Sequence, residues 1–374
     1  MGDLFIFGTL CDEALRAIVL GRVITPERAL LRDAAIFRAA DGDWPVLVDR
    51  AGEQAEGFLL RRLGADELAR LHFYEEGFDY KPVEAIVDVQ GEGPLRVTLY
   101  RPAVRQEVGR EAWSLAAWQE GWGAMTRRAA REAMALHGRI DGAALRARMP
   151  TIRTRADAFT RAARSARPEG TSAPWSRDDV DLLAARQPYA NYFAVDESEI
   201  RHPLFGGGTS PAMTRAAWLG GDAVTVLPYD PRSDRVHLVE QFRFGPYARG
   251  DLHPWILEPI AGRIDPGEDP QDTARREARE EAGLSIGRLI EIGAYYPSPG
   301  ALSEHTISYV GLCALPREGG WTGGADVENE DIRSHVITFA RLMELLSSGA
   351  LNNGPLLISA LWLARERGSL RDVG

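Results

Sequence analysis

The sequence has almost no lysine and almost no cysteine. Of its 374 residues 44 are basic, and Lys81 is the only lysine among them. A phosphate-binding loop with its lysine, or a Schiff base on a lysine, is therefore excluded at every position but one. Cys11 and Cys313 lie in different halves of the chain. This excludes a disulfide framework and a zinc site built from cysteines, and it is typical of the reducing cytoplasm.

Long apolar runs and an excess of positive charge are also lacking. No run approaches the roughly 18 apolar residues that a membrane span needs, and the first residues, MGDLFIFGTL, contain no basic leader. The formal net charge is -10, whereas a nucleic-acid backbone requires a basic face. We therefore expect a soluble cytoplasmic protein without a membrane or nucleic-acid partner, which binds small anions through local arginines.

The most informative stretch is residues 262–284, GRIDPGEDPQDTARREAREEAGL. Asp269 before a proline predicts a helix start, and Gly283 predicts its end. Between them three acids are spaced three and four residues apart, so that their carboxylates share one face of the helix: Glu277, Glu280 and Glu281. Such a face can simply be solvated, with Arg276 paired to Glu280. A divalent cation would instead turn the mutual repulsion into attraction, and hard oxygen ligands suit Mg²⁺ or Mn²⁺ rather than Zn²⁺.

The spacing of the stretch favours the metal interpretation. Its residues fill every fixed position of G-x5-E-x7-R-E-U-x-E-E-x-G-U, where U is aliphatic or small: Gly262, Glu268, Arg276, Glu277, Ala278, Glu280, Glu281, Gly283 and Leu284. The stretch resembles the Nudix box, and the second half of the chain is identified as a member of the Nudix hydrolases. The resemblance implies a mixed-sheet α/β/α sandwich. It also implies a small-molecule substrate built as a nucleoside diphosphate linked to another group.

The resemblance also implies a set of site residues. Mg²⁺, or Mn²⁺, would be held by the backbone carbonyl of Ala261 and by the carboxylates of Glu277, Glu280 and Glu281. Arg276 and Glu268 would orient the loops around the helix. In the segment VEQFR, Arg243 would hold the diphosphate, which suits the planar fork of a guanidinium. Arg215 fits a second substrate arginine, although Ala216 stands where an acid is expected beside it.

Features outside the box indicate the substrate. Pro299 is the fifteenth residue after Leu284, and within YYPSPGALSEH it resembles the proline that marks ADP-ribose pyrophosphatases. The segment VENEDIR resembles the acidic loop that supplies their general base, for which Glu328 is the first candidate and Glu330 the second. The implied reaction is hydrolysis of ADP-ribose to AMP and ribose 5-phosphate. GDP-mannose, or another nucleoside diphosphate sugar, is the nearest alternative, and the resemblance further implies a homodimer.

The first residues of the chain predict a small anion-binding corner. The strand-like segment DLFIFGTL ends in Gly8, Thr9 and Leu10 and precedes a helix expected at 12–20. A glycine at such a junction exposes backbone N–H groups that can bind a carboxylate or phosphate. An ordinary turn between strand and helix explains the same residues.

Together with WPVL and LHFYEEG, this corner resembles the γ-glutamylcyclotransferase-like family, also called AIG2-like. The resemblance implies a small β-barrel with helices, a substrate carboxylate on Gly8, Thr9 and Leu10, and Glu75 as general acid/base. Phe7 replaces the family's first tyrosine and His72 replaces an aspartate. These departures leave open a non-catalytic module that binds a metabolite.

The domain boundaries follow from composition. Residues 107–148 show helical spacing, with three tryptophans expected to pack two helices on the barrel: Trp113, Trp118 and Trp122. A helical and Pro/Gly/Ser-rich linker follows. We expect the barrel domain at 1–150, the linker at 151–187 and the Nudix domain at 188–374. This combination resembles bacterial tellurite-resistance proteins.

Secondary structure is also expected around the box. A capped helix is predicted at 176–186, followed by a strand-poor arm, ANYFAVDESEIRHPLFGGG, that could exchange between subunits. Two strands joined by a hairpin-like turn are predicted at 223–228 and 236–241, and a helix at 354–367.

Overall fold

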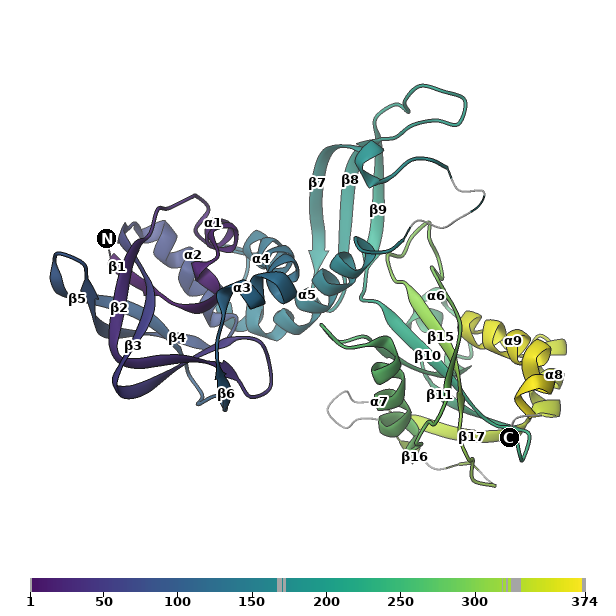
Figure 1. Ribbon diagram of the computed structural model, residues 1–374. Helices are drawn as coiled ribbons and strands as arrows, with labels where there is room; N and C mark the ends of the chain where they lie inside the picture. Colours follow the sequence, from purple (N-terminus) through teal and green to yellow (C-terminus); the bar gives the residue numbers. More distant parts are fainter. Residues whose placement is uncertain are drawn as a thin grey trace. The chain divides into compact units, whose positions relative to one another are not determined.

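A computed structural model divides the chain into two compact units, Met1–Pro168 and Glu169–Gly374. It describes residues 2–166, 170, 173–317, 319–320, 322–323 and 331–371. Both expected folds are confirmed: the first unit is a small barrel with helices, and the second is a mixed-sheet sandwich (Figure 1). In the part of the chain that the structure describes, no helix has the length and apolar character needed to span a bilayer.

A closed five-stranded barrel forms the body of the first unit. The strands follow the order β3-β1-β5-β4-β2, and a further pairing of β2 with β3 closes the ring. The two ring strands furthest apart in sequence, β1 and β5, pair in parallel, and apolar side chains such as Phe5, Leu59 and Leu99 fill the interior. The strands are β1 (Gly2–Ile6), β2 (Glu27–Ala39), β3 (Pro45–Leu63), β4 (Tyr80–Val89) and β5 (Gly93–Pro102), with β6 (Val108–Ala112) added beside β2.

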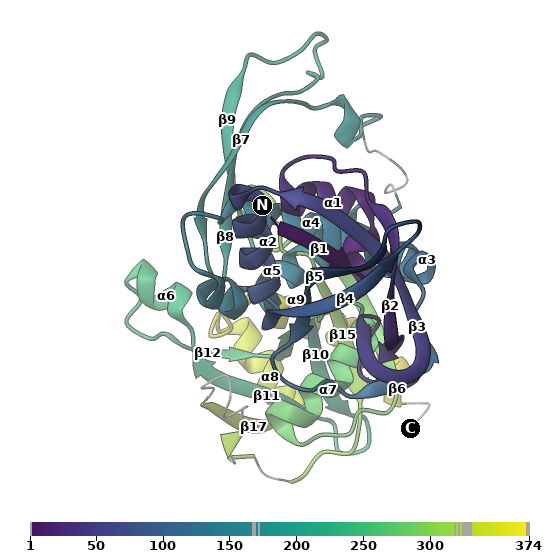
Figure 2. The same ribbon diagram turned by 90° about the vertical axis from the view of Figure 1, so that its left-hand side faces the viewer.

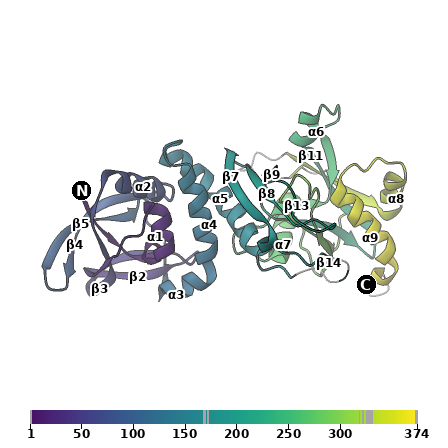
Figure 3. The same ribbon diagram turned by 90° about the horizontal axis from the view of Figure 1, so that it is seen from above.

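Helices cover the barrel at one side (Figure 3). Asp12 starts the first of them by accepting a hydrogen bond from the backbone N–H of Leu15, and Arg127 of a later helix holds Asp12 with bonds of 2.9 and 2.6 Å. Glu132, on the same helix as Arg127, forms a buried ion pair of 2.6 Å with Arg155 of the next helix. The helices are α1 (Glu13–Leu20), α2 (Ala65–Glu76), α3 (Leu115–Trp118), α4 (Ala124–Ala135) and α5 (Gly142–Ala162).

The segment 107–148 was expected to be wholly helical, and this is wrong at its start, because β6 pairs with β2 there. Trp118 is buried as expected, whereas the indole N–H groups of Trp113 and Trp122 donate to Asp43, one to its carbonyl and one to its carboxylate. Helix α5 continues past residue 150 into the stretch expected as a linker.

The second unit is a sandwich of one mixed sheet between helices. The sheet order is β14-β15-β10-β11-β17-β16, and β10 runs parallel to β15. Helix α7 (Pro270–Ala282) lies on one side of the sheet and α8 (Phe339–Ser347) and α9 (Gly354–Arg371) on the other, as Figure 1 shows. The strands are β10 (Ala223–Asp230), β11 (Arg235–Phe242), β14 (Leu289–Tyr295), β15 (Thr306–Leu312), β16 (Thr322–Gly323) and β17 (Ile332–Thr338).

The middle of this sheet is split. Strands β10 and β11 pair with each other only through residues 229–230 and 235–236. Beyond that point β11 pairs with β12 (Trp255–Glu258) and β10 pairs with β13 (Ile260–Arg263), with Pro259 between the two short strands. The segment that leads into the acidic helix therefore fills the opening between the two central strands.

A separate three-stranded antiparallel sheet precedes the sandwich in sequence and extends away from it (Figures 1 and 2). It consists of β7 (Asp181–Ala190), β8 (Ala194–Arg201) and β9 (Met213–Leu219). The predicted helix at 176–186 and the strand-poor arm are therefore wrong. Only a single turn of 3-10 helix, Arg177–Asp179, forms before β7, because residues 181–190 pair with β8 along almost their whole length.

Candidate functional site

The acidic helix has the bounds that its sequence predicts. Asp269 accepts a hydrogen bond of 2.8 Å from the backbone N–H of Gln271, and Gly283 ends the helix with a φ of 63°. One stripe of α7 packs on the sheet through small side chains, Ala274, Ala278 and Ala282. This packing fixes the rotation of the helix and therefore fixes which way its acids point.

The three predicted metal ligands differ in exposure. Glu281 is 3% exposed, whereas the Glu277 side chain is 14% exposed and that of Glu280 is 48% exposed. Glu277 lies directly against β13, since a methyl group added to Gly262 would come within 2.0 Å of its carboxylate. Only glycine allows this approach. Ala261, whose carbonyl is the predicted fourth ligand, is the residue before this point.

Arg276 organises the acids around it. Its guanidinium donates to both carboxylate oxygens of Glu268, at 3.1 and 3.0 Å, and also to Glu277 at 2.7 Å and to Glu280 at 3.0 Å. The hydrogen bond to Glu268, and after it the negative charge of Glu277, raises the pKa of Arg276 against the opposing effect of burial. Burial disfavours ionisation of Glu268, but the hydrogen bonds from Arg276 and Thr273 and the charge of Arg276 together outweigh this effect and lower its pKa. Both groups are thus held in their charged forms.

The donor set fits a hard divalent cation. It consists of carboxylates from one helical face next to a backbone strand that glycine opens, which are oxygen ligands of the kind that Mg²⁺ prefers. Among the described residues, no three His, Cys, Asp or Glu side chains already converge as a metal cluster. Nη1 of Arg276 lies 2.7 Å from Glu277 and 3.0 Å from Glu280, so a positive charge stands next to both carboxylates.

Arg243 lies at the end of β11, at the opening of the split sheet. Its Nε and Nη2 atoms lie 2.8 and 2.7 Å from one oxygen of Glu258, a residue of β12 that is 6% exposed. The side chain of Arg243 is 40% exposed, so its guanidinium combines a buried partner with access to solvent. Glu258 is not among the site residues predicted from the sequence, although an acid in the apolar strand WILEPIAG is a visible signal.

Glu304 is a second acid that was not predicted as a site residue. Burial raises its pKa, against the opposing effects of a hydrogen bond from Thr306 and of the charges of Arg263 and Arg243. It directly follows the segment SPGALS, which contains Pro299. Its position next to the motif of that proline could have identified it as a candidate site residue. The charge of Arg243 thus acts on Glu304 although the two residues are far apart in the sequence.

The remaining predicted residues of this unit are spread over other elements. Arg215 is exposed on β9, where its Nη1 donates to the carbonyl of Thr214. Pro299 lies in the segment that reaches β9 through Trp218, whose backbone bonds Ala301 and Ser303 at 2.8 and 3.0 Å. Glu328 and Glu330 lie outside the described residues.

The predicted corner of the first unit has a glycine-dependent geometry. Gly8 has a φ of 73°, and a methyl group there would meet the ring of Pro45 at 2.2 Å. Thr9 and Leu10 continue into a short 3-10 helix, Gly8–Cys11, where the carbonyl of Leu10 accepts a bond of 3.1 Å from Arg16. The structure thus brings the motifs FGTL and WPVL together.

Glu75 lies on α2 among aromatic side chains. Burial raises its pKa to about 8. The pKa values of Tyr80 and Tyr100 are raised by burial first and then by the charge of Glu75. The Tyr100 hydroxyl is 3.0 Å from Nδ1 of His72. A carboxyl group with a pKa near neutrality can both accept and donate a proton, which is the property of a general acid/base.

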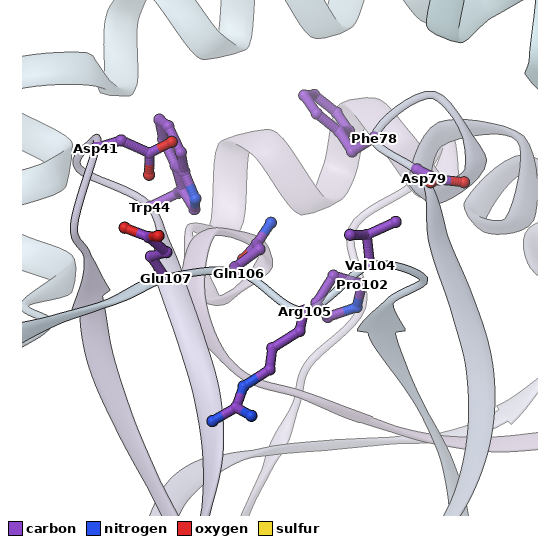
Figure 4. Close-up of a pocket in the computed structure, with 9 residues that line it drawn as sticks. All are labelled: Asp41, Trp44, Phe78, Asp79, Pro102, Val104, Arg105, Gln106 and Glu107. Atoms are coloured by element: carbon purple, nitrogen blue, oxygen red, sulfur yellow. The ribbon is translucent and has the colours of Figure 1, made fainter.

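A cavity of about 350 Å³ lies close to this group. Figure 4 shows its lining, in which Trp44 and Gln106 lie opposite Phe78. Gln106 connects the cavity to the Glu75 surroundings, because its side-chain oxygen is 3.4 Å from the hydroxyl of Tyr80. The complete lining is Asp41, Trp44, Phe78, Asp79, Pro102, Val104, Arg105, Gln106 and Glu107.

Comparisons with known proteins agree with the two folds. The NUDIX domain family matches residues 220–357, and the family of γ-glutamyl cyclotransferase, AIG2-like, matches residues 4–120. The ADP-ribose pyrophosphatase of Escherichia coli (strain K12) is 35% identical over 206 residues, which are 55% of this chain and 98% of that protein. The corresponding enzyme of Haemophilus influenzae is 36% identical over 200 residues, 53% of this chain and 92% of that protein.

A further relative carries a different name. The GDP-mannose pyrophosphatase of Salmonella arizonae is 33% identical over 150 residues, which are 40% of this chain and 77% of that protein. Both resemblances seen in the sequence are thereby confirmed. The chain belongs to the Nudix hydrolases, with a second unit of the ADP-ribose pyrophosphatase type and a first unit of the AIG2-like γ-glutamyl cyclotransferase family.

Proposed function

We propose that the second unit hydrolyses the diphosphate bond of ADP-ribose and releases AMP and ribose 5-phosphate. The observation that carries the proposal is the acidic face of α7, whose Glu277 lies against Gly262 at the opening of the split sheet. The choice of ADP-ribose rests on the relatives named for it, because they match over more than 90% of their own length.

The proposed roles combine the resemblance of the motifs with the contacts of the described side chains. Glu277, Glu280, Glu281 and the carbonyl of Ala261 would hold Mg²⁺, or Mn²⁺, which when bound supplies positive charge to the diphosphate and lowers the pKa of water. Arg243, fixed by Glu258, binds the diphosphate through its exposed edge, and Arg215 binds the substrate from β9. Glu328, or Glu330 as the second candidate, accepts the proton of the attacking water.

The three-stranded sheet supports a further part of the proposal, a homodimer. Apolar side chains are exposed on it and beside it, namely Leu182, Leu183, Tyr189, Tyr192 and Trp218. Exposed apolar surface on an extended sheet is typical of a protein interface, and a second copy of this chain is the occupant that the relation to dimeric Nudix enzymes implies.

Substrate choice can be tested with purified protein and Mg²⁺. We expect ADP-ribose to give AMP and ribose 5-phosphate with a kcat/KM at least ~10-fold above that for GDP-mannose. Chelation with EDTA should abolish turnover and excess Mg²⁺ should restore it. A preference for GDP-mannose would contradict the substrate assignment, and full turnover in EDTA would contradict the metal.

The first unit has a second candidate function, which the pKa of Glu75 favours. An intramolecular attack by the amine of a γ-glutamyl compound on its side-chain carbonyl needs a group that takes a proton from the amine and returns one to the leaving amine. Glu75, with a pKa of about 8, has this capacity. The Gly8 corner would bind the substrate carboxylate through its backbone N–H groups. The alternative is a module that binds a metabolite without converting it.

The pH dependence of Glu75→Gln tests this function. Cyclotransfer on a γ-glutamyl amine should rise with pH around a midpoint of about 8, as Glu75 ionises, and Glu75→Gln should abolish it.

Thermal unfolding is a separate measurement of the protonation state of Glu75. Burial keeps Glu75 protonated in the folded state, whereas the unfolded carboxyl ionises near 4.5, so the group's contribution to stability is complete below 4.5 and is lost as pH rises through about 8.

Glu75→Gln removes this loss, so its melting temperature should exceed that of the parent increasingly between pH 4.5 and 8. Glu76→Gln, a change at the next, exposed residue, is the matched control and should follow the parent. Ligand binding to the parent without any product would support the non-catalytic alternative. Equal melting curves of parent and Glu75→Gln at every pH would contradict the burial of the carboxyl group.

A further inference from the structure

Glu258 is the centre of a buried polar cluster behind Arg243. Its Oε2 accepts from Nε of Arg243 at 2.8 Å, and Nη2 of the same guanidinium lies at 2.7 Å. Its Oε1 accepts a bond of 3.1 Å from the side-chain amide of Asn353. Glu258 is 6% exposed, and leaving such a carboxylate without partners would be costly. Both oxygens are therefore fixed from opposite directions.

Asn353 belongs to the start of the last helix. Its Oδ1 accepts from the backbone N–H of Leu356 at 2.9 Å, and its carbonyl accepts from that of Leu357 at 3.0 Å, so it caps α9. The side chain of Asn353 thus caps the N-terminus of α9 with its oxygen and donates to Glu258 with its amide nitrogen. Because Leu356, Ala360 and Leu363 pack α9 into the buried core, the helix that positions Asn353 is held in place.

Arg243, on the opposite side of Glu258 from Asn353 in this series of contacts, has a long side chain whose orientation must be fixed. A long arginine side chain loses rotamer freedom when it is held in one orientation, and the side chain of Arg243 is 40% exposed. Glu258 accepts from Nε and lies 2.7 Å from Nη2, and these two contacts on one side of the guanidinium fix its plane. An arginine prepared in this way binds a diphosphate without losing that freedom on binding.

We propose that Glu258 is a positioning residue for the hydrolysis, which orients Arg243 for the substrate diphosphate and is itself fixed by Asn353. The inference rests on the proposed role of Arg243. It adds a functional connection from the N-terminus of α9 to the substrate, through Asn353, Glu258 and Arg243 in that order. Two effects of Glu258 oppose each other, because its charge also repels a diphosphate, and the loss of orientation dominates at an arginine that is open to solvent screening.

A double-mutant cycle in the full chain tests the proposal. Glu258→Gln should raise KM about tenfold with kcat within about threefold of the parent, as expected when ground-state and transition-state binding weaken together. Arg243→Ala should raise KM further. The double variant should match Arg243→Ala alone, because Glu258 has no effect once its arginine is absent. Asn353→Asp, which keeps the cap acceptor but loses the amide donor to Glu258, should raise KM by a smaller factor.

A matched control separates positioning from general stability. Asp234, like Glu258, is an acid that accepts hydrogen bonds from an arginine, in this case Arg367 of α9. It lies in the turn between β10 and β11. Asp234→Asn should lower the melting temperature and leave KM at the parental value. Asparagine is suitable there because Asp234 has a φ of 55°, which asparagine tolerates.

Each outcome has a distinct meaning. Effects of Glu258→Gln that add to those of Arg243→Ala, or a KM of Glu258→Gln at or below the parental value, would overturn the positioning role while leaving the proposed function intact. A parental KM in Arg243→Ala would overturn both the inference and the proposed role of Arg243. The assay uses whichever of ADP-ribose and GDP-mannose the parent hydrolyses, so an error in substrate identity does not affect the result.

Discussion

Replacing Glu281 by glutamine is expected to lower kcat for ADP-ribose by about three orders of magnitude, because the change removes one of the proposed metal ligands. Glu281 is the most buried of the three acids on the face of α7, at 3% exposed. Glutamine has nearly the same shape, so the packing of the helix should persist. It also removes the repulsion from Glu277 one turn earlier, so the melting temperature without metal should be unchanged or slightly higher.

The experiment measures kcat over a range of Mg²⁺ concentrations together with thermal unfolding in EDTA. Asp272→Asn is the matched control, since it makes the same change of charge at an exposed position in the first turn of the same helix. It should keep parental kcat. Parental activity of Glu281→Gln at saturating Mg²⁺ would contradict the metal assignment, and a large loss of melting temperature would show that Glu281 stabilises the fold instead.

The parts of the fold that the sequence predicts are those with local signals. The bounds of α7 follow from Asp269 before a proline and from Gly283, and both residues act in the structure as expected. The hairpin at 231–234 follows from a run of turn-forming residues between two apolar strands. Gly262 is also part of the sequence motif, but the requirement for glycine there comes from tertiary structure, because a side chain would collide with Glu277.

The parts that the sequence did not predict depend on partners far away in the chain. Residues 181–190 lack a clear apolar alternation, and they become a strand because β8 lies beside them. Glu258 resembles any other acid in an apolar strand until Arg243 and Asn353 are brought to it from positions 15 and 95 residues away. Motif spacing therefore located the acids of the helix and the arginine, but not the side chains that hold the arginine.

The structure changes how the second unit should be isolated. A fragment beginning at 188 would cut β7, whereas Glu169–Gly374 keeps all three strands of the extended sheet. Strand β7 supports the site indirectly. Its Tyr189 stacks on Trp218 of β9 at 6.3 Å between ring centroids. Trp218 in turn hydrogen-bonds Ala301 and Ser303, which precede Glu304, and the charge of Arg243 acts on Glu304.

Two fragments are therefore expected to differ sharply. Fragment 169–374 should hydrolyse ADP-ribose with a kcat/KM within about twofold of the full chain, and it should be a dimer whose activity falls on dilution below its dissociation constant. Fragment 191–374, which lacks β7, leaves an edge of β8 unpaired, and it should lose the dimer and at least about 100-fold in kcat/KM. Turnover and sedimentation of both fragments and of the full chain provide the measurement.

Glu75→Gln in the full chain is the control for the first unit, because Glu75 belongs to the barrel domain and should not affect this hydrolysis. A soluble, folded but inactive fragment 169–374 would show that the first unit completes the site. Full activity of fragment 191–374 as a monomer would show instead that neither β7 nor a second copy is required. In that case Trp218 and the segment 301–303 would have to hold their arrangement through β8 and β9 alone, which are still paired from Ala194 to Ile200 in that fragment.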